Sequence, residues 1–256
     1  MPVPTRFALA AIAAAVLVVL STPQIRKPIS RFLSFSGPTA EDHADERLPK
    51  INLALAAAKP GFVFLAGDSH AELMGDDPLC GSPIVNGGST GANAKRYSSL
   101  LSDFDFKARP GKIVLIIGTN DAFIKNRPME PRNLAEKVAR IGSIVETLTK
   151  ISSHLVMTPL PPILPESTRV LEVEALTALS QKQKDLCERT VGCQFIDPYR
   201  EMRGESFGLA LPGAVKEDGF HSADYGKVRK ALEQAMCPDP VVTSKDASAA
   251  QPPKLH

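Results

Sequence analysis

The chain has 256 residues, of which 43% are hydrophobic and 23% charged, and its formal net charge is +2. This length and balance are typical of a soluble globular protein with room for one sizeable α/β domain and its terminal segments. They argue against a nucleic-acid-binding protein, because the chain has no basic stripe with interleaved aromatic residues.

The first predicted element is an uncharged apolar run at residues 7–20, FALAAIAAAVLVVL. As a helix it would be about 21 Å long, which is short of the roughly 30 Å hydrocarbon core of a bilayer. The run has no polar face and Pro23 follows it, so an export signal or a marginal signal anchor within residues 1–23 is favoured over a buried core helix. We therefore expect the folded domain to work outside the cytoplasm, as a periplasmic or secreted protein. Cleavage of this segment and membrane attachment through residues 7–20 remain alternatives.

Two further segments have the composition of connecting or disordered chain. Residues 24–45 combine Pro, Ser, Gly and charges of both signs, and are interpreted as a linker. Residues 238–256 lack periodicity and are rich in Pro, Ala and polar residues, which predicts a disordered tail. The folded domain is therefore expected within residues 46–237.

Strand-like and helix-like segments alternate through this domain. Short apolar runs predict strands at 62–66, 84–86, 112–118, 154–158 and 193–197. Helical patterns lie at about 46–58, 92–104, 131–150, 168–189 and 223–236. The alternation predicts an α/β fold, a three-layer α/β/α sandwich whose central sheet has about five mostly parallel strands with helices on both faces.

The carboxyl ends of parallel strands form one rim, where ligands bind in such sheets. Four short motifs fall on or near this rim: GDS at 67–69, NGGSTG at 86–91, GTND at 118–121 and DGFH at 218–221. Each motif alone is typical of a turn, because Gly, Asp and Asn favour turns for backbone reasons. Their occurrence together and in this order indicates a functional site.

With these four blocks the chain resembles the SGNH hydrolases, also called the GDSL-type esterases and lipases, from residue 61 to about residue 236. The resemblance implies a flavodoxin-like α/β/α fold and cleavage of carboxylic esters through an acyl-serine intermediate. It assigns Ser69 to the first block and Asn120 to the third. In the second block Gly87 and Gly88 are both candidates, and the N-x-G spacing favours Gly88. The last block supplies Asp218 and His221.

The chemistry of an esterase requires these residue types. A serine hydroxyl is a weak nucleophile, so Ser69 needs a general base, and His221 is the candidate. Asp218 lies three residues before His221 and can orient its imidazole. The developing oxyanion needs preorganised donors, for which the backbone N–H groups of Ser69 and Gly88 and the side-chain amide of Asn120 are the candidates. No metal and no organic cofactor are expected.

His70 follows the candidate nucleophile and stands where the family name has leucine. Adjacent residues at the start of a helix project about 100° apart, so His70 should point away from the Ser69 hydroxyl. We interpret it as a packed or partly exposed helix residue without a catalytic role. Asp68 and Asp121 are expected to hold the turns beside Ser69 and Asn120.

The cysteines are Cys80, Cys187, Cys193 and Cys237, and an even count suits an oxidising compartment. Cys187 and Cys193 are close enough in sequence to be bridged, which leaves Cys80 with Cys237, one of three possible connectivities. Four separate buried thiols are the alternative.

The favoured function is that of a serine esterase acting on short acyl groups, such as O-acetyl groups of envelope or extracellular carbohydrate. Its partner would be a small-molecule or carbohydrate ester and not nucleic acid. Residues 71–83 are polar and rich in turn formers, so they provide no hydrophobic lid for long acyl chains. Alternatives are an O-acyltransferase, a lysophospholipase or thioesterase, and a non-catalytic module that binds acetylated glycan. The oligomeric state is left open.

Overall fold

The computed structural model describes residues 39–237. Of the two compact units into which the chain divides, the one that begins at His43 contains the sheet and the candidate site. The expected signal segment, the expected tail and residues 24–38 of the expected linker lie outside the described residues, so this division of the chain stays a prediction. None of the helices within residues 39–237 is both long enough and apolar enough to cross a membrane.

The first described helix starts earlier than the sequence pattern indicated. Helix α3 spans Ala40–Ala57 and so includes residues 40–45, which were interpreted as the end of the linker. Its first turn is capped by Thr39, whose hydroxyl accepts the Asp42 N–H (3.2 Å), while the Asp42 carboxylate accepts the Thr39 N–H (3.0 Å). This reciprocal cap satisfies N–H groups that a helix start would otherwise leave without a partner.

The predicted parallel sheet is confirmed. It has five strands in the order β2-β1-β3-β4-β5, and every neighbouring pair is parallel. The strands are β1 Val63–Gly67, β2 Ile84–Gly88, β3 Lys112–Ile116, β4 Leu155–Met157 and β5 Cys193–Phe195.

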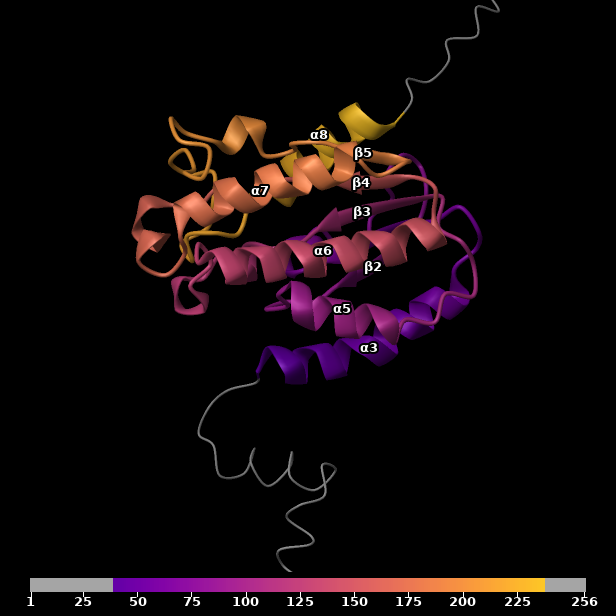
Figure 1. The fold of residues 1–256 in the computed structure, drawn as a ribbon. Coiled ribbons are helices and arrows are strands. Elements are labelled where there is room, and N and C mark those ends of the chain that lie inside the picture. Colours follow the sequence, from indigo (N-terminus) through magenta and orange to yellow (C-terminus); the bar gives the residue numbers. More distant parts are fainter. Residues whose placement is uncertain (1–38, 238–256) are drawn as a thin grey trace, which may run out of the picture. The chain divides into compact units, whose positions relative to one another are not determined.

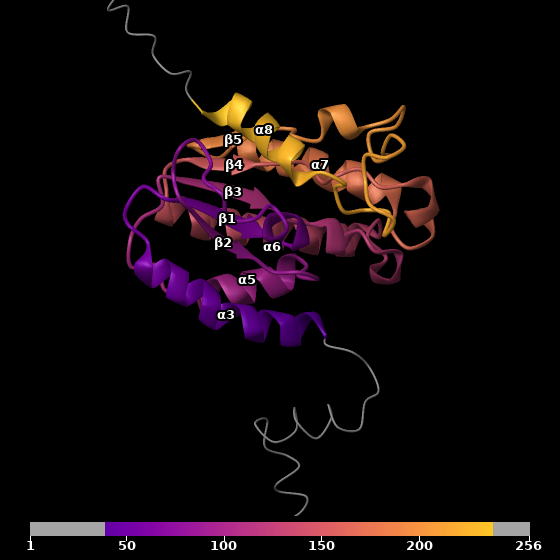
Figure 2. The same cartoon turned by 180° about the vertical axis from the view of Figure 1, so that it is seen from behind.

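Helices cover both faces of this sheet, as predicted. Alternate side chains of β1 enter opposite cores, with Phe64 and Ala66 on one face and Val63 and Leu65 on the other. Figure 1 shows α5 (Ala94–Ser102), α6 (Pro131–Ile151) and α7 (Val173–Glu188) over the first face, and α3 also packs into this core. Figure 2 shows α8 (Tyr225–Met236) over the opposite face, where the short helix α4 (Ser69–Glu72) also lies.

Two helical predictions differ from the structure in detail. Helix α7 begins at Val173 and not at residue 168, because residues 165–169 form a separate 3₁₀ turn whose first residue is proline. The sequence analysis expected a helix to start at Ser69 and His70 but gave no bounds for it, since the four residues of α4 are too few to show a helical period.

The four cysteines form two disulfides, so the alternative of four separate thiols is wrong. Cys187 at the end of α7 is bonded to Cys193 at the start of β5. Cys80, in the loop before β2, is bonded to Cys237, which directly follows α8. Both bonds tie a helix end to the sheet or to a loop beside it.

Candidate active site

A sharp turn at the end of β1 places Ser69 on the rim of the sheet. Gly67 has φ of 137°, and a Cβ at this position would lie 1.7 Å from the Ile116 carbonyl oxygen of β3, so only glycine fits. Asp68 then caps α4 by accepting the His70 N–H (3.0 Å). Ser69 is therefore the first residue of a helix that starts directly at the strand end.

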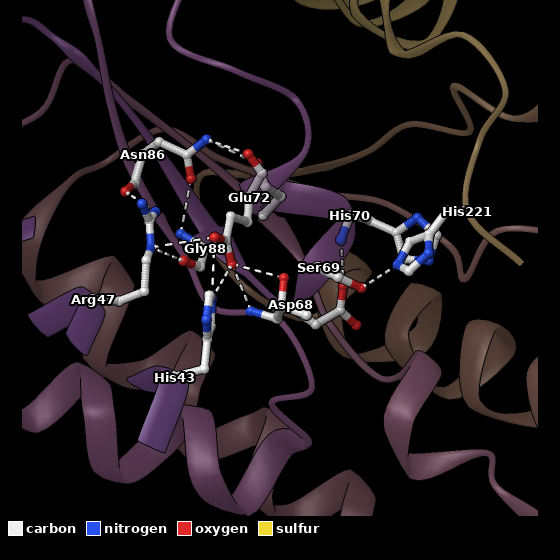
Figure 3. A network of polar contacts seen from close by, with 11 residues as sticks. His43, Arg47, Asp68, Ser69, His70, Glu72, Asn86, Gly88 and His221 are labelled. Atoms are coloured by element: carbon white, nitrogen blue, oxygen red, sulfur yellow. Dashed lines mark hydrogen bonds and ion pairs between the residues drawn. The ribbon is translucent and has the colours of Figure 1, made fainter. Parts of the chain in front are cut away.

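The structure brings Ser69, His221 and Asp218 together in the order that the sequence analysis proposed. His221 Nε2 lies 2.7 Å from Ser69 Oγ, a contact visible in Figure 3, although the two residues are 152 positions apart. His221 Nδ1 lies 2.8 Å from Asp218 Oδ2. The other carboxylate oxygen of Asp218 accepts the backbone N–H groups of Phe220 (3.1 Å) and His221 (3.0 Å).

These contacts keep the Asp218 carboxylate ionised. Partial burial acts to raise its pKa, but the backbone and side-chain hydrogen bonds from His221 outweigh burial and the pKa lies below its ordinary value. A charged acceptor on Nδ1 favours the tautomer in which Nε2 faces the serine without a proton. The arrangement is therefore suited to removing the Ser69 hydroxyl proton.

Asn120 lies beside the turn that follows β2. Its side-chain Nδ2 donates to the Ala92 backbone carbonyl (3.0 Å), and the backbone carbonyl of Asn120 accepts from Asn126 Nδ2 (3.2 Å). The neighbouring Asp121 accepts the Ala94 N–H (2.8 Å) at the start of α5, and burial raises the pKa of this carboxyl group to about 6. The third block thus packs against the second block.

Gly88 does not occupy the position that the sequence analysis proposed for it. It is the last residue of β2, and its N–H donates to Asn86 Oδ1 (3.0 Å) instead of being free for an oxyanion. A Cβ at Gly88 would lie 2.2 Å from the Glu72 backbone nitrogen, so glycine is required here to let α4 pack on β2. The prediction failed because the N-x-G spacing does not reveal where the strand ends.

The turn after β2 offers another donor. Among residues 39–237, the backbone N–H groups of Ser69 and Gly91 donate no hydrogen bond. Gly91 has φ of 76°, a conformation that favours glycine, and it directly precedes Ala92, which contacts Asn120. Gly91, the third glycine of the NGGSTG motif, could have been identified from sequence only as a turn residue.

His70 is fully buried and does not contact the Ser69 hydroxyl. Its Nδ1 lies 3.0 Å from the Tyr225 hydroxyl, and its ring centroid lies 5.1 Å from that of His221. Burial, together with repulsion from His221, lowers the pKa of His70 to about 3. Next to it, burial raises the pKa of Asp68 to about 7, despite the His70 N–H that donates to its carboxylate. His70 is thus a packed, neutral residue.

His70 and Asp68 should make the free energy of unfolding depend on pH in opposite directions. Between pH 3 and 6.5 the unfolded chain binds a proton at His70 that the native protein does not, so stability falls as the pH falls. Between pH 3.8 and 7 the native protein binds a proton at Asp68 that the unfolded chain does not, so stability rises as the pH falls. We expect His70→Gln to lose less stability on acidification than the unmodified protein and Asp68→Asn to lose more.

Urea unfolding at pH 4.5 and 6.5 measures both changes. The unmodified protein is the reference, and the quantity compared is the difference between the two free energies of unfolding. A shift of the two variants in the same direction would show that the two burial effects are assigned wrongly.

Comparisons with known proteins agree with the fold. No family model and no curated protein matches the chain. Among solved structures, a Streptococcus pneumonia protein provisionally described as a platelet activating factor superposes with a TM-score of 0.64 at 17% identity, covering 84% of this chain and 99% of its own. A GDSL-like lipase from Bacteroides thetaiotaomicron superposes with a TM-score of 0.53 at 16% identity, covering 73% of this chain and 96% of its own. An acetylxylan esterase from Geobacillus stearothermophilus superposes with a TM-score of 0.51 at 16% identity, covering 70% of this chain and 94% of its own. The chain therefore has the fold that its resemblance to the SGNH hydrolases implied.

Proposed function

We propose that the protein is a serine hydrolase of carboxylic esters. The observation that carries this proposal is the 2.7 Å contact between Ser69 Oγ and His221 Nε2, with Asp218 on the other ring nitrogen. A nucleophile, a base and an orienting carboxylate in hydrogen-bond contact are the parts that acyl transfer requires. The shared fold with a GDSL-like lipase and an acetylxylan esterase supports the same reaction class.

The reaction then runs in two halves. His221 Nε2 takes the proton of Ser69 as its Oγ attacks the ester carbonyl, and the protonated imidazole returns that proton to the leaving alcohol. The acyl group stays on Ser69 until a water molecule attacks it and gives a proton to His221 Nε2. The imidazolium then returns that proton to Ser69 Oγ as the acyl–oxygen bond breaks and the carboxylic acid leaves. Asp218 stabilises the imidazolium that forms in each half.

The negative charge of each tetrahedral intermediate needs donors. We assign this role to the backbone N–H groups of Ser69 and Gly91 and to Asn120 Nδ2. Support for Gly91 in place of Gly88 comes from its unoccupied N–H and from the contact of its neighbour Ala92 with Asn120. Donors fixed before the reaction stabilise the oxyanion without reorganisation.

We propose short acyl groups, such as O-acetyl groups on envelope or extracellular carbohydrate, as the substrate. The short, turn-rich segment between α4 and β2 supports small acyl groups over long ones. The two disulfides support work in an oxidising compartment outside the cytoplasm.

An ester panel tests this proposal. Hydrolysis of p-nitrophenyl esters should be fastest for acetate and fall with chain length, and acetate should be released from acetylated oligosaccharides. A second arm adds an oligosaccharide acceptor to an acyl donor and measures transfer, which separates an esterase from an O-acyltransferase. Folded protein that cleaves none of these esters would refute the hydrolase proposal.

A further inference from the structure

A partly buried carboxylate lies one helical turn from the nucleophile. Glu72 is the last residue of α4, and its Oε2 accepts both the backbone N–H (2.7 Å) and the hydroxyl (2.8 Å) of Thr90. Figure 3 shows the same carboxylate facing His43 and Arg47 of α3, with His43 Nε2 at 2.9 Å and Arg47 Nε at 3.6 Å. The Glu72 side chain is 18% exposed.

These partners keep Glu72 charged. Burial acts to raise its pKa, but the hydrogen bonds from His43 and Thr90, together with the charge of Arg47, outweigh burial and lower the pKa below its ordinary value. An ionised acceptor makes a stronger hydrogen bond to a backbone N–H than a neutral one does. The hydrogen bond from the Thr90 backbone N–H to Glu72 is therefore one of the stronger hydrogen bonds of this turn.

A second set of contacts fixes α4 to the end of β2. Asn86 Nδ2 lies within hydrogen-bonding distance of the carbonyls of Ala71 (3.1 Å), Glu72 (3.0 Å) and Gly75 (3.2 Å). Arg47 donates to the carbonyls of Asn86 (3.0 Å) and Gly88 (3.1 Å). Helix α4, strand β2 and helix α3 are thus joined by charged and amide side chains.

The turn of residues 89–92 is held at four points, one of which is the Gly91 carbonyl, which accepts from Arg96 Nη1 (3.1 Å). The Ser89 N–H donates to the Gly67 carbonyl (3.0 Å), and Ala92 accepts from Asn120 (3.0 Å). Between them, Thr90 is held by Glu72, and Thr90 directly precedes Gly91. Because Ser69 and Glu72 belong to the same helical turn, the position of this turn relative to the nucleophile depends on Glu72.

We propose that Glu72 is a positioning residue, whose carboxylate holds Thr90 so that the Gly91 N–H faces the oxyanion formed at Ser69. His43 and Arg47 orient the carboxylate from α3. Glu72 contacts neither the substrate nor the reacting atoms and acts only through the turn. This inference rests on the proposed esterase function.

The role predicts a specific kinetic pattern. A displaced oxyanion donor weakens only the transition state, so Glu72→Ala should lower kcat and leave KM within about twofold. We expect a loss of about 10- to 100-fold, since a displacement of about 1 Å can cost two orders of magnitude in rate. Glu72→Gln keeps a carbonyl oxygen for the Thr90 N–H and should lose no more than about threefold in kcat.

A matched control separates positioning from general stability. Arg229 of α8 donates to the carbonyls of Asp77 (3.0 Å) and Met74, which lie after α4, and it does not contact residues 89–92. Arg229→Met therefore removes one exposed and one partly buried hydrogen bond, and an ion pair with Asp77, beside α4 and leaves the turn intact. The kcat of Arg229→Met should stay within about twofold of that of the unmodified protein. Its thermal stability should fall by about as much as that of Glu72→Ala.

The experiment measures kcat, KM and thermal stability for these variants with p-nitrophenyl acetate, and hydrogen exchange of the Thr90 amide. Faster exchange of this amide in Glu72→Ala, with the expected loss of kcat, supports the proposal. Unchanged exchange, or a kcat equal to that of Arg229→Met, overturns it. If the unmodified protein hydrolyses no ester, the esterase proposal fails, while the exchange measurement still shows whether Glu72 holds the turn.

Discussion

Ser69→Ala is expected to abolish ester hydrolysis, by about 10⁴-fold or more in kcat, without changing the fold. The substitution removes only the hydroxyl that attacks the carbonyl, and the loss of one oxygen atom from the buried Ser69 side chain changes the packing little. Hydrolysis of p-nitrophenyl acetate gives the rate, and circular dichroism reports whether the variant is folded. Full activity in a folded Ser69→Ala protein would remove the proposed mechanism.

The same assay distinguishes the two neighbouring histidines. His221→Ala should lose activity as Ser69→Ala does, because no other base contacts the Ser69 hydroxyl among the described residues. His70→Gln should retain most activity, since His70 bonds to Tyr225 and not to Ser69. Loss of activity in His70→Gln alone, with His221→Ala active, would mean that the wrong base has been assigned.

Asn120→Ala is expected to lower kcat by about 10²- to 10³-fold, with KM nearly unchanged. In the proposed mechanism its side-chain N–H stabilises the charge that exists only in the tetrahedral intermediates and the transition states around them. Steady-state kinetics with p-nitrophenyl acetate measure the effect.

Asn126→Ala is the control for this variant. Asn126 donates to the Asn120 backbone carbonyl (3.2 Å), so its loss loosens the same loop while leaving the Asn120 amide in place. We expect a much smaller decrease in kcat for this variant. Equal losses in both variants would indicate that the loop, and not the Asn120 amide, is what the reaction needs.

The sequence predicted the sheet well because its central strands, β1, β3 and β4, are buried on both faces. The run KIVLIIG at 112–118 is apolar without alternation, which is typical of a central parallel strand, and β3 lies there between β1 and β4. The order of the motifs along the chain then placed Ser69 and Asn120 at strand ends on one rim. His221 could be placed only through the resemblance, because it precedes a helix and follows no strand.

What the sequence could not predict depends on register and on side-chain contacts between segments. Gly67 of β1 lies opposite Gly88 of β2, so β2 continues through the glycines where a turn was expected. This register turns the Gly88 N–H toward Asn86 and brings Thr90 to Glu72. A glutamate at the end of a four-residue helix carries no periodic signal, so the role proposed for Glu72 was not visible from sequence.

The central claim is that the Ser69 hydroxyl is activated by His221. Labelling with a fluorophosphonate probe, followed by mass spectrometry of the peptides, tests it directly, because the probe reacts with an activated serine. The account predicts one modified residue, Ser69, and no labelling in His221→Ala. Folded protein that is not labelled, or that is labelled at another residue, would contradict it.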